Sequence, residues 1–143
     1  MAQHPKFSVS VVTPEGPAFE GEAEMIVVPG AAGEIGVLAR HAPLVAMLNA
    51  GSTRVYLDTD TDEIRTFATG PGFFQVLEDR AIALVDDAVM ARDIDKERAQ
   101  RQLDEAKAEL EKVETGESSA DRWQLEQRIK HAENQLQVSG AAG

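Results

Sequence analysis

The sequence predicts an antiparallel β-sandwich followed by an antiparallel helical hairpin, and a change in the period of its apolar residues carries this prediction. Before Asp93, short apolar runs alternate with polar residues and are separated by turn-forming residues, as half-buried strands require. After Asp93, apolar residues recur at spacings of three and four, which is the period of a helix packed on one side. We therefore expect a β-sandwich domain over residues 1–90 and a helical hairpin domain over residues 91–143.

The first part should contain short strands that are bounded by Gly, Pro, Asn and Asp. We expect them at 7–13, 17–22, 23–28, 34–38, 43–48, 52–57, 63–69, 73–77 and 80–85. Tight turns are expected where these residues cluster, as at Pro14 to Gly16 and Gly70 to Gly72. Because no helical pattern lies between the strands, they favour an antiparallel sandwich over a parallel α/β sheet.

Two helices are expected in the second part, each with an apolar seam. The seams are Ala99, Leu103, Ala106, Leu110 and Val113, then Leu125, Ile129, Ala132 and Leu136. We expect Asp93 to cap the first helix, with Asp95 adding favourable charge, and Ser118 with Asp121 to form a capping box for the second. Alanine in the seams buries little apolar area, so we expect the hairpin to dock weakly on the sandwich, as a switch requires.

Composition limits the classes of function. The net charge is −11, and residues 1–93 hold 14 acidic and 6 basic side chains, so no basic face for nucleic acid is expected. Cysteine is absent, which excludes disulfides and Cys-ligated metals. The longest apolar runs, such as Ala81 to Val85, are too short to span a bilayer, and no apolar signal core precedes Phe7. We expect the protein to stay where it is made and to reach a membrane only through another protein.

No catalytic or metal-binding motif stands out in the sequence. The three histidines, His4, His41 and His131, share no ligand spacing, so no metal site is expected. The acidic run 58–62 resembles the start of a calcium loop, but Glu63 and Thr69 stand where that loop requires Gly and Glu. The glycines at 30, 33 and 36 match neither a dinucleotide fingerprint nor a P-loop, and are interpreted as turn residues.

One stretch resembles a known family. Residues 33–44, GEIGVLARHAPL, are similar to the G-E-x-G…H-A-P-L signature of the bacterial F-type ATP synthase epsilon subunit. Three further segments agree in order: VVTPEG at 11–16, TGPGFFQV at 69–76 and IDKERA at 94–99. The resemblance extends over about residues 6–138. It implies the same architecture that the periodicity predicts, a β-sandwich followed by a helical hairpin.

The resemblance implies a non-catalytic rotor subunit of the central stalk. The sandwich would link the gamma subunit to the c-ring and help to couple proton translocation to ATP synthesis. The turn facing the c-ring falls on Ala31, Ala32, Gly33 and Glu34. His41 and Pro43 belong to the same motif and would border gamma. The chain would then lie at the cytoplasmic face of the bacterial cell membrane as a peripheral part of the synthase.

The helices would be a regulator, folded on the sandwich or extended into the alpha/beta catalytic head to inhibit ATP hydrolysis. No cofactor is required. Some members bind regulatory ATP at a motif matched here by Ile94, Asp95, Arg98 and Ala99. The positions where those members carry further arginines hold Glu105, His131 and Gln135, and a triphosphate needs several cations. We therefore hypothesise that this chain binds ATP weakly or not at all.

Two other classes of function remain open from the residues alone. One is a free-standing ligand-sensing β-sandwich module whose helical hairpin acts as a lid. The other is an enzyme with a site on the sandwich, which would need convergent side chains with perturbed pKa values.

Overall fold

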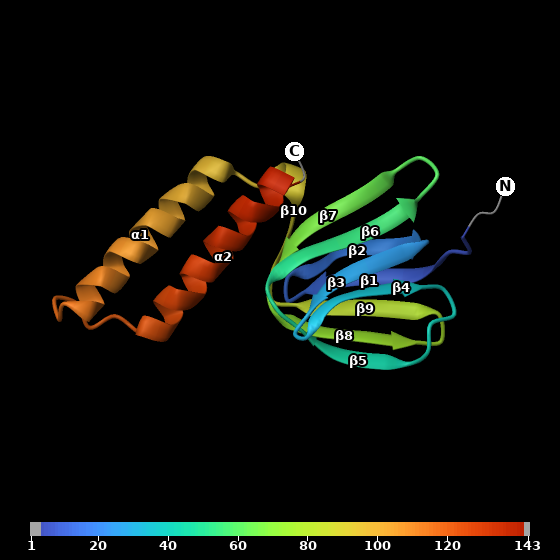
Figure 1. Ribbon diagram of the computed structural model, residues 1–143, viewed down its shortest axis with the longest axis horizontal. Helices are drawn as coiled ribbons and strands as arrows, with labels where there is room; N and C mark the ends of the chain where they lie inside the picture. The colour runs from blue at the N-terminus through green and yellow to red at the C-terminus, as the bar shows by residue number, and fades with distance from the viewer. Residues whose placement is uncertain (1–3, 142–143) are drawn as a thin grey trace. The chain divides into compact units, whose positions relative to one another are not determined.

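A computed structural model describes residues 4–141 of the chain (Figure 1). The chain divides at the link between Met90 and Ala91 into two compact units. The first unit consists of strands and the second of helices, which confirms the predicted fold class. Among residues 4–141, no helix is long and apolar enough to cross a membrane.

Over the described residues 4–90, ten strands form the first unit. They are β1 (Phe7–Thr13), β2 (Gly16–Ala23), β3 (Met25–Gly30), β4 (Gly33–Leu38), β5 (Leu44–Leu48), β6 (Gly51–Asp58), β7 (Glu63–Thr69), β8 (Gly72–Leu77), β9 (Arg80–Val85) and β10 (Ala88–Met90). Nine of them were expected from the sequence, with ends that differ by at most two residues. The tenth, β10, pairs with β7 and was not predicted.

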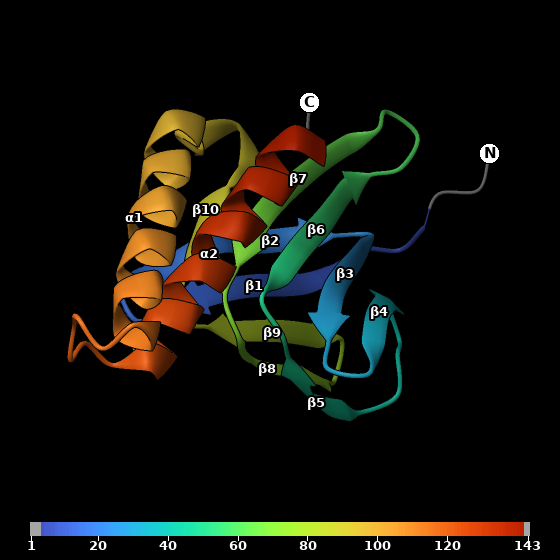
Figure 2. The ribbon, with the colours of Figure 1, turned by 60° about the vertical axis from the view of Figure 1, so that its left-hand side comes forward.

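The strands form two layers (Figures 1 and 2). The strand order is β10-β7-β6-β3 and then β5-β8-β9-β1-β2, with β4 paired to β3. A single residue pair, Gly30 with Leu48, joins β3 to β5 where the sheet passes from one layer to the other. All neighbours are antiparallel except β1 and β9, which run parallel. The β1–β9 pair is therefore the one departure from antiparallel pairing in a sandwich that otherwise agrees with the prediction.

The core of the sandwich is built from alternate residues of facing strands, as strand geometry requires. Its largest fully buried side chains are Phe67 and Phe74, which come from opposite layers. Aliphatic residues fill the space around them: Val9, Val11, Ile26, Val28, Val37, Val55 and Val76. Each such side chain stabilises the fold by roughly 1.5–3 kcal/mol when fully buried.

The second unit holds a short 3-10 turn (Ala91–Asp93) and two helices, α1 (Lys96–Glu114) and α2 (Arg122–Ala141), which pack against each other. The expected seams are confirmed: Ala99, Leu103, Ala106, Leu125 and Ala132 are buried, and the remaining seam residues are half-buried.

Both predicted caps are wrong by a few residues. Asp93 ends the 3-10 turn, and Asp95 caps α1 by accepting a hydrogen bond from the Arg98 amide at 3.1 Å. At α2 the cap is Asp121, whose carboxylate accepts from the Trp123 amide at 2.9 Å. Ser118 instead accepts from the Ala120 amide within the connecting loop.

Candidate binding surfaces

The outer side of strands β5, β8 and β9 exposes a group of large apolar side chains, which we call the apolar face. It comprises Val45, Met47, Phe73, Leu77 and Leu84. Val45 is 71% exposed, Met47 57% and Phe73 53%. Met47 lies opposite Phe73 in the register of β5 and β8, and Phe73 lies opposite Leu84 in that of β8 and β9. The three side chains therefore form one row across the strands.

This face arises because these strands carry apolar residues at consecutive positions. In β8, Phe74 and Val76 point into the core, so Phe73 and Leu77 must point outward. In β5, Leu48 is buried and its neighbour Met47 is exposed for the same reason. A contiguous exposed apolar patch on a small domain marks a surface that binds another molecule. This face was not predicted, although consecutive apolar residues within one antiparallel strand are a signal for it in the sequence.

The loop between β4 and β5 lies at one end of the apolar face and holds the predicted residues His41 and Pro43, both exposed. Arg40 has a positive φ of 64°, and its amide donates a hydrogen bond to the carboxylate of Asp79. Asp79 belongs to the tight turn between β8 and β9, so this bond fixes the loop beside that turn. The His41 Nδ1–H donates to the Ala42 carbonyl at 2.7 Å, which orients the imidazole.

The turn between β3 and β4 lies at the other end of β5 and holds the four residues expected to face a ring of subunits. Ala31, Ala32, Gly33 and Glu34 are all exposed. The Ala31 amide donates to the Met47 carbonyl at 2.9 Å. This bond attaches the turn to the strand that carries the apolar face.

Glycine is required on both sides of this turn. Gly33 has a φ of 135°, a conformation that residues with a Cβ rarely adopt. A Cβ at Gly30 would meet the Gly33 carbonyl oxygen at 2.6 Å, well inside van der Waals contact. The turn is therefore a fixed projection of the sheet.

Glu34 does not stand alone at this turn. Its two carboxylate oxygens accept hydrogen bonds from Nη2 of Arg54 at 3.1 and 3.2 Å. Arg54 lies in the middle of β6, and the ion pair passes over β3, which lies between β6 and β4. Glu34 was predicted as a candidate from its motif, but Arg54 was not, because the two residues are twenty positions apart and only the strand order brings them together.

The residues of the candidate ATP segment at the start of α1 have different environments and do not form one binding site. Asp95 caps the helix with one carboxylate oxygen, Arg98 is exposed, and Ala99 is buried against α2. Ile94 is half-buried, and Glu105 is exposed on the same helix. Among residues 4–141, no group of His, Cys, Asp and Glu side chains could hold a metal ion.

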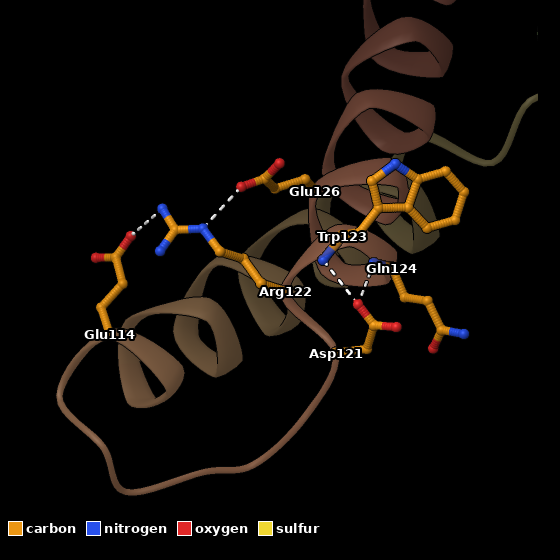
Figure 3. Close-up of polar contacts among 6 residues, drawn as sticks. All are labelled: Glu114, Asp121, Arg122, Trp123, Gln124 and Glu126. Atoms are coloured by element: carbon orange, nitrogen blue, oxygen red, sulfur yellow. Dashed lines mark hydrogen bonds and ion pairs between the residues drawn. The ribbon is translucent and has the colours of Figure 1, made fainter.

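Arg122 bridges the two helices at the tip of the hairpin (Figure 3). Its guanidinium pairs with Glu114 at the end of α1 at 3.1 Å and with Glu126 one turn further along α2 at 3.0 Å. The hydrogen bond that Arg122 donates to the Glu126 carboxylate, and then the negative charge of Glu114, raise the pKa of Arg122 above its usual value. Trp123 beside it is 66% exposed. Such exposed pairs contribute little to stability, so this contact sets geometry more than it holds the helices together.

Comparison with known proteins gives matches to both units. Residues 6–91 match the family model described as ATP synthase, Delta/Epsilon chain, beta-sandwich domain. Residues 92–140 match the model described as ATP synthase, Delta/Epsilon chain, long alpha-helix domain. Together the two models span nearly all of the described residues.

Curated relatives are similar to this chain over most of its length. ATP synthase epsilon chain 2 of Ralstonia nicotianae is 39% identical over 132 residues, which are 92% of this chain and 91% of the relative. The ATP synthase epsilon chain of Halalkalibacterium halodurans is 35% identical over 136 residues, covering 95% of this chain and 98% of the relative.

A solved structure shows the same fold at low sequence identity. The match is a chain of the Euglena gracilis mitochondrial ATP synthase, in a structure of its OSCP, F1 and c-ring parts. It has a TM-score of 0.76 at 21% identity and covers 99% of this chain and 85% of that one.

Proposed function

The chain belongs to the ATP synthase delta/epsilon family, and we propose that it is the central-stalk subunit that links gamma to the c-ring. Its relatives are named ATP synthase epsilon chains, and in this proposal the chain acts in the stalk without an active site of its own. Its part in the synthase is to join two rotor components so that proton translocation is coupled to ATP synthesis.

The apolar face is the observation that supports this proposal best. A domain that leaves Val45, Met47 and Phe73 more than half exposed needs a partner to cover them, and in this proposal the partner is gamma. His41 and Pro43 extend the same surface at the loop end of β5. Gamma would then contact both the strands and the loop.

The exposed turn at residues 31–34 supports the link to the c-ring. It projects from the sheet at the opposite end of β5 from the loop, so the two contacts use different ends of one strand. A rotor subunit must transmit torque, and rigid turns held by hydrogen bonds and by glycine geometry suit that task. Ala31, Ala32, Gly33 and Glu34 are proposed to form this contact.

The helical hairpin is proposed to regulate the synthase by inhibiting ATP hydrolysis when it extends into the alpha/beta head. Its buried seam, between α1 and α2, contains three alanines, Ala99, Ala106 and Ala132, which bury less apolar area than leucine would, so the two helices hold each other weakly. A weakly held element of this kind can exist in two arrangements. We propose that ATP is not its strong ligand, because Asp95 is used as a cap and Glu105 would repel phosphate.

The proposed location is the cytoplasmic face of the bacterial cell membrane, as a peripheral part of the complex. Affinity purification of the full chain from native membranes tests the proposal. Recovery of gamma and c subunits is the expected result. Purification of the chain without either subunit would refute it.

A further inference from the structure

Arg54 lies on the outer side of the layer opposite the apolar face. Its strand neighbour Val55 is fully buried in the core, so the Arg54 side chain leaves the sheet on the other side. Across β3 it reaches Glu34, whose side chain is 62% exposed, while that of Arg54 is 35% exposed. We propose that Arg54 is a positioning residue for the turn at residues 31–34, and this inference rests on the proposed contact of that turn with the c-ring.

The environment of Arg54 shows that its place on the sheet is constrained. Arg54 lies directly opposite Val27 of β3, which also points away from the core but is only 8% exposed. Directly opposed side chains on one face of a sheet are about 5 Å apart. The aliphatic stem of Arg54 can therefore cover Val27 and keep it from solvent. The Arg54 Nε is itself buried and has no hydrogen-bond partner. A buried N–H donor without a partner costs free energy, so another contact must compensate for it. The ion pair between the guanidinium and Glu34 is that contact.

The Glu34–Arg54 ion pair changes the charge and the shape of the surface that the turn offers to the c-ring. Glu34 is the one ionisable residue of the turn, and it lies on a part of the chain with 14 acidic and 6 basic side chains. An unpaired carboxylate there would add to this negative field and would move freely. Paired with Arg54, Glu34 is neutralised and drawn over β3, so that Ala31 and Ala32 form the projecting tip. The c-ring contact is therefore a compact, electrically neutral one whose shape depends on Arg54.

The test measures binding of the full-length chain to a purified gamma–c-ring rotor and to gamma alone. Arg54→Ala should weaken binding to the rotor roughly tenfold, the size expected for a residue that shapes an interface contact, and leave binding to gamma alone unchanged. Arg54→Lys should restore part of the loss, because ammonium can pair with Glu34 but lacks the planar guanidinium. The exchange Glu34→Arg with Arg54→Glu should recover most of the affinity.

Arg65→Ala is the matched control. Arg65 lies on the adjacent strand β7, is 34% exposed and forms an ion pair with Glu63 at 3.7 Å. It is not near the turn, so its removal should leave rotor binding unchanged. Arg65→Ala should leave the melting temperature within a degree or so of the wild type, as expected for an exposed pair. Arg54→Ala also removes the stem over Val27 and should lower it somewhat, whereas Arg54→Lys keeps the stem, so a rotor-binding defect that Arg54→Lys partly restores does not come from unfolding.

Four results would overturn the inference. They are unchanged rotor binding by Arg54→Ala, tighter rotor binding by Arg54→Ala, an equal loss for gamma alone, and no recovery by the exchanged pair. Tighter binding would mean that Glu34 acts as a free carboxylate. A wild-type chain that binds gamma and gains no affinity from the ring would instead refute the proposed c-ring contact itself.

Discussion

Truncation of Phe73 tests the apolar face most sharply. Phenylalanine has about 200 Å² of accessible surface, so a side chain that is 53% exposed leaves about 100 Å² to be covered by a partner. At about 25 cal/mol per Å², full burial would contribute about 2.5 kcal/mol to binding. Alanine keeps a small part of this, so Phe73→Ala should weaken gamma binding by about 2 kcal/mol, or roughly 30-fold.

The measurement is the dissociation constant of the full-length variant for purified gamma, by calorimetry or surface plasmon resonance. Ile64→Ala is the control, since Ile64 is 37% exposed on the opposite layer and should have little effect. The melting temperature of Phe73→Ala should stay close to that of the wild type, because half of the side chain is already in water. If Phe73→Ala bound gamma as tightly as Ile64→Ala did, the assignment of this face to gamma would be wrong.

The remaining predictions concern the helical unit. Truncation after Asp93 should raise the ATPase activity of the assembled complex while leaving assembly intact, and unchanged activity would remove the inhibitory role. Titration calorimetry of the full chain with ATP should show no micromolar binding, and a micromolar dissociation constant would contradict the interpretation of Glu105. Asp95→Ala should destabilise α1 by about 1 kcal/mol, seen as lower helicity on heating, whereas an unchanged melting curve would show that the cap is dispensable. Arg122→Ala should barely change the melting temperature, and a large loss would mean that the hairpin tip is a stabilising contact after all.

Most of the fold could be predicted because the local signals agree with the final structure. Nine strands follow from alternation and turn residues, and both helices follow from seams such as Leu103 and Leu125. The predictions of the helix caps were wrong because more than one nearby residue could act as the cap. Asp93 and Asp95 are both good caps, and only the 3-10 turn at 91–93 decides between them. Strand β10 has three residues, too few for a pattern, and exists because β7 offers an edge to pair with.

The candidate sites were also predictable only where their residues lie close together in the sequence. Residues within one motif, such as His41 and Glu34, could be proposed as candidates from the sequence because it carries the whole signature. The apolar face and Arg54 required the register of separate strands, which no local window contains. Met47, Phe73 and Leu84 form a row only after β5, β8 and β9 are placed side by side. Surfaces that depend on strand order therefore had to come from the structure.

Site-specific photo-cross-linking in the assembled synthase tests the central claim most directly. A benzoylphenylalanine at Phe73 keeps an aromatic ring on the apolar face, and a second variant carries it at Ala32 in the exposed turn. Illumination should join the first variant to gamma and the second to subunit c. Cross-links from Phe73 to neither rotor subunit, with none from Ala32 to the ring, would contradict the account of this chain as the link between them.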